Sequence, residues 1–386
     1  MFEGLCFELR HLAANCSQPD VKIVYCSPSQ PPALPPSPAS PPALPLPPFS
    51  PPPPVGAKSN MSTIEYPQWA VQAGGTDAVL GFGIAYDGVG GALVSGSFSG
   101  QASFGSTTLT SRGTEDAFVM HVTASGAIDW AVQAGDHGLL GNHLDGGTSN
   151  HIGNHIDDPG YGIAHDGAGG AFVTGFFMDG ASFGSTFLES RGLADAFVMH
   201  VTASGAIDWA VQAGGASIAS GLSIAHDGAG GALVTGYFIG DASFGSTLLE
   251  SRGALVNSLA DAFVMHVTAS GAIDWAVQAG GASWTSGRGI AHDGVGGALV
   301  TGYFSGHAFF GSTSLTAQGS SDAFVMHVTA SGAIDWAVQA GGADTNTAGY
   351  DIAHDGAGGA LVTGTLTARY RSARRRSPAK AIATLS

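Results

Sequence analysis

The stretch DAFVMHVTASGAIDWAVQAG at residues 116–135 occurs four times in this chain, letter for letter. The other three copies begin at Asp195, Asp261 and Asp322. A long internal repeat of this kind is typical of proteins built from one supersecondary unit that packs against its own copies. The block therefore predicts a repeat protein.

The repeat extends well beyond this block. Each unit also contains an IAxDGxGGA element, as in IAHDGAGGALVTGYF at residues 224–238, and an ASFGST motif follows it in the first three units, as at residues 102–107. The equivalent tryptophans lie 61, 79, 66 and 61 residues apart, at Trp69, Trp130, Trp209, Trp275 and Trp336. Units of this length are large enough to hold one small sheet each.

Four segments of each unit are predicted to be strands: GIAHD, ALVTGYF, DAFVMHVT and AIDWAVQA. They are rich in β-branched and aromatic residues and are bounded by glycine or serine turns. The DGAGG and ASGA segments supply the tight hairpins between them. Because Phe118, Val119 and Met120 are all apolar, both faces of the sheet are expected to be covered. Four antiparallel strands with two buried faces are typical of a blade of a β-propeller.

These motifs resemble the seven-bladed β-propeller repeat family, often called SBBP repeats. The order GIAHDGAGGALVTGYF, FGS, DAFVMHV and GAIDW carries the resemblance over about residues 65–366. The resemblance implies a propeller and little about activity. This chain has four complete units and a fifth that stops after ALVTGTLTA, so a seven-bladed ring is not supported.

The two ends of the repeat region carry complementary partial units. Residues 65–73 match only the last strand of a unit, and residues 351–366 match only the first two. Together they are predicted to complete a fifth blade and close the ring. The missing third strand has two explanations: Ala379–Leu385 substitutes for it, or the natural protein continues beyond residue 366 with further repeat segments. The basic, non-repetitive sequence that follows favours the second explanation.

The predicted organisation has four parts. Residues 1–27 form a poorly ordered N-terminal segment, residues 28–60 a Pro-rich spacer, residues 61–366 an all-β propeller, and residues 367–386 a basic tail. Fifteen of the 27 residues at 28–54 are proline, which favours an extended spacer. The three cysteines all precede this spacer, so no disulfide can link the repeats, and the odd count leaves one thiol free or paired between chains: Cys6, Cys16 and Cys26.

The repeat region is strongly acidic. Residues 61–368 contain 26 Asp and Glu but only four Arg and no Lys, so their net charge is −22. Such a surface repels nucleic acid and attracts cations or basic partners, including the basic tail. No run of about 18 apolar residues is present, so no transmembrane segment is predicted.

Several short signals favour a location outside the cell or at its surface. Asn15 and Asn60 stand in glycosylation acceptor patterns on either side of the spacer. The Ser-Pro-Pro pattern resembles the stalks of plant and algal wall proteins. The first residues, MFEGLCFELR, do not have the charge pattern of a signal peptide.

The positions of the histidines bear on whether the repeats are catalytic. Eight of the 14 histidines recur at repeat-equivalent positions, which favours a role in packing or turns: His121, His200, His266 and His327, and His165, His226, His292 and His354. The aspartate of each DG turn is predicted to accept hydrogen bonds from the turn backbone, and weak Ca²⁺ binding by this set is the alternative.

One insertion differs from the repeats. Residues 136–160 contain four non-repeated histidines and four aspartates. Imidazole and carboxylate groups together suit Zn²⁺ or another divalent ion such as Ca²⁺. The predicted metal ligands are His143, Asp145, His151, His155, Asp157 and Asp158. A solvated glycine-rich loop without metal is the alternative.

Length varies between units only on one rim of the predicted propeller. We call it the variable rim; it carries the insertion at 136–160 and the five extra residues within 253–261. The opposite rim, with the DGAGG and ASGA turns, is called the turn rim. Because loops on a rigid scaffold carry function, a protein or carbohydrate partner is expected on the variable rim.

No phosphate-binding loop, nucleophile elbow or paired metalloprotease histidines are present, and every candidate catalytic residue outside the insertion comes in several copies. The sequence therefore favours a non-catalytic binding or scaffolding propeller. A divalent-cation-dependent carbohydrate-binding protein and a propeller hydrolase or lyase with its site on the variable rim remain open.

Overall fold

The computed structural model describes residues 70–113, 115–136, 162–253, 259–356 and 358–368, and the backbone of the strand Ala379–Leu385. Every regular element in these residues is a strand, and the neighbouring strands of each sheet run antiparallel. The predicted all-β class is therefore confirmed. A search of the same residues for an apolar helix with the length of a membrane span found none.

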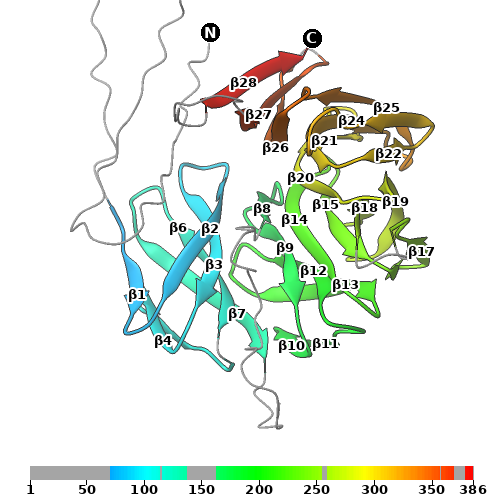
Figure 1. Ribbon diagram of the computed structural model, residues 1–386. Coiled ribbons are helices and arrows are strands. Elements are labelled where there is room, and N and C mark those ends of the chain that lie inside the picture. The colour runs from blue at the N-terminus through cyan, green and yellow to red at the C-terminus, as the bar shows by residue number, and fades with distance from the viewer. Residues whose placement is uncertain are drawn as a thin grey trace, which may run out of the picture. The chain divides into compact units, whose positions relative to one another are not determined.

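The strands form four complete units and part of a fifth (Figure 1). A short strand, β1 (Ala73–Gly75), precedes the first unit. Unit 1 contains β2 (Val79–Tyr86), β3 (Ala92–Phe98), β4 (Gln101–Phe104), β5 (Thr107–Thr110), β6 (Asp116–Val122) and β7 (Ile128–Asp136). Unit 2 contains β8 (Gly162–His165), β9 (Ala171–Phe177), β10 (Gly180–Phe183), β11 (Thr186–Glu189), β12 (Asp195–Val201) and β13 (Ile207–Gly215). Unit 3 contains β14 (Ala219–His226), β15 (Ala232–Ile239), β16 (Asp241–Phe244), β17 (Thr247–Glu250), β18 (Ala260–Val267) and β19 (Ile273–Gly281). Unit 4 contains β20 (Thr285–His292), β21 (Ala298–Phe304), β22 (His307–Phe310), β23 (Thr313–Thr316), β24 (Asp322–Val328) and β25 (Ile334–Ala340). Unit 5 contains β26 (Thr345–His354), β27 (Ala360–Ala368) and β28 (Ala379–Leu385).

Four strands of each complete unit are those predicted, in the order β2-β3-β6-β7 in unit 1 and likewise in units 2 to 4. The turn between the first two strands requires glycine, because Gly88 and Gly90 have φ angles of 86° and 106°. Because β2 pairs with β3 and β6 pairs with β7, both antiparallel, the hairpins predicted from the DGAGG and ASGA motifs are confirmed.

The ASFGST motif was missed as structure. It forms a two-stranded ribbon such as β10–β11, which turns at Gly184 with a φ of 61°. Each ribbon pairs with the end of the last strand of the preceding unit, as Ala134 does with Phe183. The same pairing joins β1 to β4, β13 to β16 and β19 to β22. A complete unit therefore has six strands, and its ribbon belongs to the sheet of its neighbour.

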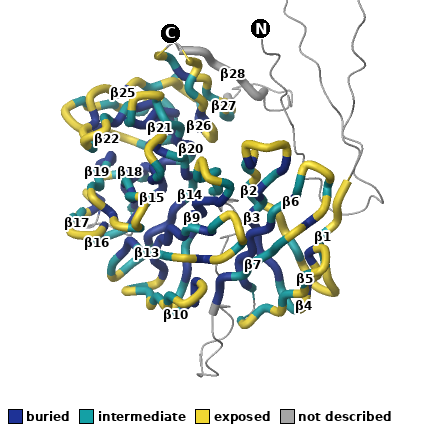
Figure 2. The backbone as a smooth tube through the Cα atoms, turned by 180° about the vertical axis from the view of Figure 1, so that it is seen from behind, coloured by how far each residue is buried: buried dark blue, intermediate teal, exposed yellow. Residues whose placement is uncertain are grey.

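The core runs from one unit into the next. Second and third strands are buried on both faces, while turns and ribbons carry most of the exposed backbone (Figure 2). Three phenylalanines fill each complete unit; in unit 3, Phe244 lies 5.6 Å from Phe238 and 4.9 Å from Phe263, ring centre to ring centre. These rings pack in one cluster with Val198 and Ala213 of unit 2. Each unit thus completes the core of the unit before it.

Consecutive units are joined through their first strands, so that β14 lies beside β8 and β20, and β26 beside β20 (Figure 1). The described strands form separate consecutive sheets, and no sheet contains strands of both the first and the fifth unit. The structure thus shows a row of antiparallel repeat sheets but not the predicted ring closure.

The end of the chain supplies a third strand for unit 5. Strand β28 pairs with β27 so that Ala360 lies opposite Leu385, the register in which Ala232 lies opposite Val267 in unit 3. The first explanation of the missing strand, substitution by Ala379–Leu385, therefore describes this structure, whereas the sequence had favoured the second.

Candidate functional site

The predicted metal site lies outside the described residues. His143, Asp145, His151, His155, Asp157 and Asp158 all fall within residues 137–161. Elsewhere, in the parts of the chain that the structure describes, no group of three or more His, Cys, Asp or Glu is arranged to hold a metal ion. The metal site stays a prediction.

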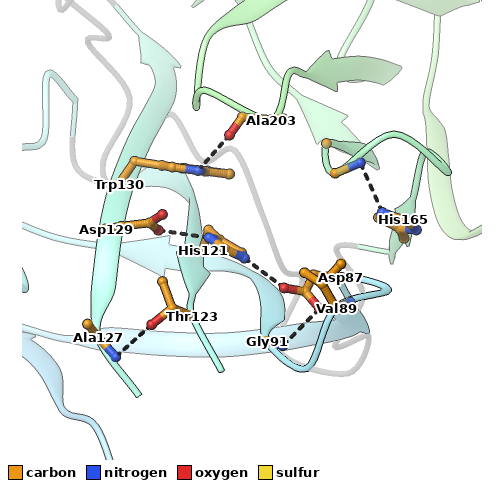
Figure 3. A network of polar contacts seen from close by, with 12 residues as sticks. Asp87, Val89, Gly91, His121, Thr123, Ala127, Asp129, Trp130, His165 and Ala203 are labelled. Atoms are coloured by element: carbon orange, nitrogen blue, oxygen red, sulfur yellow. Dashed lines mark hydrogen bonds and ion pairs between the residues drawn. The ribbon is translucent and has the colours of Figure 1, made fainter. Parts of the chain in front are cut away.

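The third-strand histidine of each complete unit lies between two carboxylates on the turn rim. In unit 1, His121 Nε2 lies 3.0 Å from Asp87 Oδ2, and its Nδ1 lies 2.8 Å from Asp129 Oδ1 (Figure 3). Asp87 belongs to the first hairpin turn and Asp129 to the fourth strand, so one imidazole connects this turn with the third and fourth strands. Two acceptors suit a ring with both nitrogens protonated.

This clamp, which we define as a histidine and its two aspartates, has the same geometry in units 2 to 4. Every nitrogen–oxygen distance lies between 2.7 and 2.9 Å. The other clamps are His200 with Asp166 and Asp208, His266 with Asp227 and Asp274, and His327 with Asp293 and Asp335.

The turn aspartate also holds its own turn. Asp87 Oδ1 accepts hydrogen bonds from the backbone N–H groups of Val89 and Gly91, both at 2.8 Å. Burial alone would raise the pKa of Asp87, but the hydrogen bonds from His121 and from these amides lower it to about 2. The turn role predicted for this aspartate is therefore present in the structure.

Burial and hydrogen bonding shift the pKa of the histidine in the opposite directions to those at the aspartate. Burial alone would lower the pKa of His121, but its hydrogen bonds to Asp87 and Asp129 raise it. Similar contacts raise the pKa of His327 and lower that of Asp293. In units 1 and 4 these pKa shifts favour a charged imidazole beside a charged turn aspartate.

A tryptophan links each of the first three clamps to the next unit. The rings of Trp130 and His121 stack 5.7 Å apart, centre to centre. Trp130 Nε1 donates a hydrogen bond to the backbone oxygen of Ala203 in unit 2, at 3.1 Å (Figure 3). Gly205 lies directly against the indole, because a Cβ atom there would come within 2.8 Å of the ring. Trp209 and Trp275 pack against Gly271 and Gly332 in the same way.

The second set of repeated histidines also packs between units. His165 lies over the turn of unit 1, 3.3 Å from where a Cβ atom of Gly88 would be. His226, His292 and His354 have the same position over Gly167, Gly228 and Gly294. Both sets of repeated histidines thus make packing and turn contacts, and a Cβ atom would crowd the contact most at Gly228, where it would come within 2.8 Å of His292.

A buried carboxylate on the variable rim was missed by the sequence reasoning. Asp261 is fully buried and accepts a hydrogen bond from Gln278 Nε2 at 3.1 Å. Burial raises its pKa to about 6, against the lowering effect of Arg252 and Gln278. Asp195 has the same partner type in Gln212, and burial raises its pKa as well. The Asp and the Gln that occur in all four copies of the twenty-residue block are the sequence feature that could have predicted this pair.

The described side chains therefore form repeated structural contacts. A search of protein-family models and a search of curated proteins found no match to this sequence.

Proposed function

We propose that the chain is a non-catalytic binding or scaffolding module whose five units close into a β-propeller. The observation that carries the proposal is the contrast between the two rims. The turn rim carries the same clamp four times with closely similar distances, whereas all differences in length between units fall on the variable rim. A constant scaffold with variable loops on one side is typical of binding proteins.

Closure is supported by what the two end units leave exposed. At each internal boundary a large side chain of one unit's second strand packs in the same cluster as an isoleucine of the next unit's first strand. These pairs are Leu93 with Ile163, Phe172 with Ile224, Leu233 with Ile290 and Leu299 with Ile352. Two residues at equivalent positions remain, one in each end unit. Ile84, in the first strand of unit 1, is 72% exposed, and Leu361, in the second strand of unit 5, is 43% exposed. They are the two halves of a fifth such pair.

On the turn rim, the contact between a glycine turn and the first-strand residue of the next unit is likewise left open at the two end units. The turn of every unit but the last lies under a histidine of the following unit, whereas no described atom lies within 4 Å of a Cβ atom built at Gly356. The residue at the histidine position in unit 1 is Tyr86, which is exposed. In a closed ring, Tyr86 covers Gly356, and residues 65–73 supply the fourth strand beside β28.

The proposed partner is a protein or a carbohydrate on the variable rim, and the Pro-rich spacer and acceptor asparagines favour an extracellular or cell-surface location. The net charge of −22 over residues 61–368 favours a neutral or basic partner over a nucleic acid. Carbohydrate binding that depends on Zn²⁺ or Ca²⁺ held by residues 137–161 is the second candidate, favoured by the histidines and aspartates of that segment.

The test is a glycan array and a set of candidate wall proteins probed with the full chain and with a variant in which residues 137–161 are replaced by a short Gly-Ser link. If the partner binds the variable rim, the variant is expected to lose this binding, while the thermal midpoint of the variant stays that of the full chain. A chelator separates the two candidates, because it should abolish the glycan signals only if carbohydrate binding depends on a cation. Turnover of a bound substrate would contradict the non-catalytic proposal.

A further inference from the structure

Between units 4 and 5 an apolar cavity of about 120 Å³ is open, and it lies where the other unit boundaries are filled. Its unit 4 wall includes Val325, Val338 and Ala340. Its unit 5 wall includes Val362 and Leu366. A cavity of about 150 Å³ with such a lining accepts a benzene ring, so the space is close to the size of one aromatic side chain.

The boundary between units 3 and 4 shows what normally fills this space. There the equivalent wall residues Val264 and Ala279 are fully buried in one cluster with Phe304, Phe310 and Phe324. The three rings come from the second strand, the ribbon and the third strand of unit 4. All four complete units supply such a set of three.

Unit 5 does not supply these rings in its described residues. Leu366 stands at the position of Phe304, and Ala381 takes the register position of the third-strand phenylalanine. No described ribbon follows β27. As a result Val338 is 41% exposed and Ala340 is exposed, although Ala279 is fully buried.

Among the described strands, no ribbon pairs with β25. In units 1 to 3 the last strand pairs with the ribbon of the next unit, and Ala279 lies opposite Phe310. Strand β25 is an edge strand of its sheet within the described chain. At Gly342 the edge is closed by Thr345, whose backbone N–H and side-chain hydroxyl both bond to that glycine. The open part of the edge therefore lies at Ala340.

We propose that this site binds an extended peptide segment of another polypeptide, which adds a strand beside Ala340 and places an aromatic side chain in the cavity. The ligand class follows from the internal boundaries, where strands of sequence GASF, DASF and HAFF make the same contact with the preceding unit. Addition of a strand to a free sheet edge provides backbone hydrogen bonds, and a pocket for one side chain provides specificity. The site is separate from residues 137–161, so it stands or falls independently of the function proposed above.

The experiment uses a fluorescein-labelled peptide of residues 240–250, GDASFGSTLLE, titrated with the full chain and followed by fluorescence anisotropy. We expect saturable binding below millimolar concentration. The Phe244→Ala peptide is expected to bind about tenfold more weakly or worse, because burial of the ring is lost.

Two chain variants locate the site. Val338→Lys places a charge in the cavity and should weaken binding at least about tenfold. Leu366→Phe fills the cavity with the residue that the other four units have at this position, so it should weaken binding without lowering the thermal midpoint. Val295→Lys, at an exposed turn of unit 4, is the matched control and should bind as the unchanged chain does.

Failure of the unchanged chain to bind the peptide overturns the proposal. So does equal affinity of the unchanged chain and the Leu366→Phe variant, because the peptide then binds elsewhere. Equal affinity for the two peptides also overturns it, since the aromatic side chain would then have no role.

Discussion

At the scale of single residues, the clamps show which contacts a histidine makes at the same position of every complete unit. The imidazole of His327 bridges Asp293 in a hairpin turn and Asp335 in the fourth strand. It joins parts of the unit that lie far apart in sequence. The stacked tryptophan, Trp336, shields one face of the ring. The clamp thus fixes the relative positions of the two hairpins on the turn rim.

Replacement of His327 by glutamine tests this role. We expect a loss of about 1–2 kcal/mol of unfolding free energy, because two charged hydrogen bonds disappear and Asp335 is partly solvated. The raised pKa of His327 means that its contribution is complete below pH 6.5 and is lost as the pH rises through the folded-state value. The lowered pKa of Asp293 means that its contribution is lost as the pH falls below 3.8.

The difference in unfolding free energy between the unchanged chain and the His327→Gln variant should therefore be largest between pH 3.8 and 6.5. Urea denaturation at pH 5 and pH 9 measures it. His307→Gln, at an exposed and non-repeated histidine, is the control and should change stability by no more than about 0.5 kcal/mol. An equal loss at both pH values would show that the charged clamp is not what stabilises the fold.

Single residues also show where sequence reasoning ends. The turn role of Asp87 was predictable, because an Asp-Gly pair defines its own turn. Its contact with His121 was not, because the two residues are 34 positions apart and meet only in the observed strand register. The burial of Asp261 was missed because a carboxylate at the start of an apolar strand looks like a solvated end.

At the scale of elements, the ribbon is the feature that couples one sheet to the next. Its two short strands surround a glycine turn, so the motif resembles a simple connection when it is viewed alone. Its partner is the last strand of the preceding unit, and this pairing cannot be seen within one repeat. The four longer strands were predicted correctly because their apolar pattern is local. The ribbon could not be predicted in this way, because its pairing depends on the neighbouring unit.

Two adjacent phenylalanines of strand β22 provide a direct comparison of the ribbon's faces. Phe310 is fully buried against Phe304 and Phe324, whereas Phe309 is 41% exposed beside Arg252. Phe310→Ala should cost about 3–5 kcal/mol, because a large cavity opens between units 3 and 4. Phe309→Ala should cost no more than about 1 kcal/mol. Chemical denaturation of the two variants checks the difference, and similar costs would mean that the ribbon does not seal the boundary.

At the scale of the whole molecule, the order of the units follows from the sequence but their closure does not. Each unit carries the same contacts to its neighbour, so the repeats alone predict a consecutive row. Whether the row closes depends on contacts between Ile84 and Leu361, which are far apart in the chain and exposed at its two end units. The candidate metal ligands depend on a non-repeated segment outside the described residues, where the repeats provide no guide.

Closure is tested by a disulfide. In a background with Cys6, Cys16 and Cys26 replaced by serine, Ile84→Cys with Leu361→Cys should cross-link within single chains in dilute solution. The internal pair Leu233→Cys with Ile290→Cys is the matched control, since these residues pack in one cluster at the boundary of units 3 and 4. Electrophoresis under non-reducing conditions after size-exclusion chromatography provides the readout. Cross-linking of the control pair alone, or links between chains only, would contradict a closed ring.

The tryptophan-on-glycine contact between consecutive units has a consequence for the gene. Because Trp130, Trp209 and Trp275 each meet the same glycine turn of the following unit, one unit can succeed any other without a new interface. Repeated coding segments favour unequal recombination, which adds or removes whole copies. A chain whose boundaries are interchangeable tolerates such changes in copy number, since stability is approximately a sum over units and their boundaries. Related genes should therefore differ first in the number of their units, and only later in the residues within them.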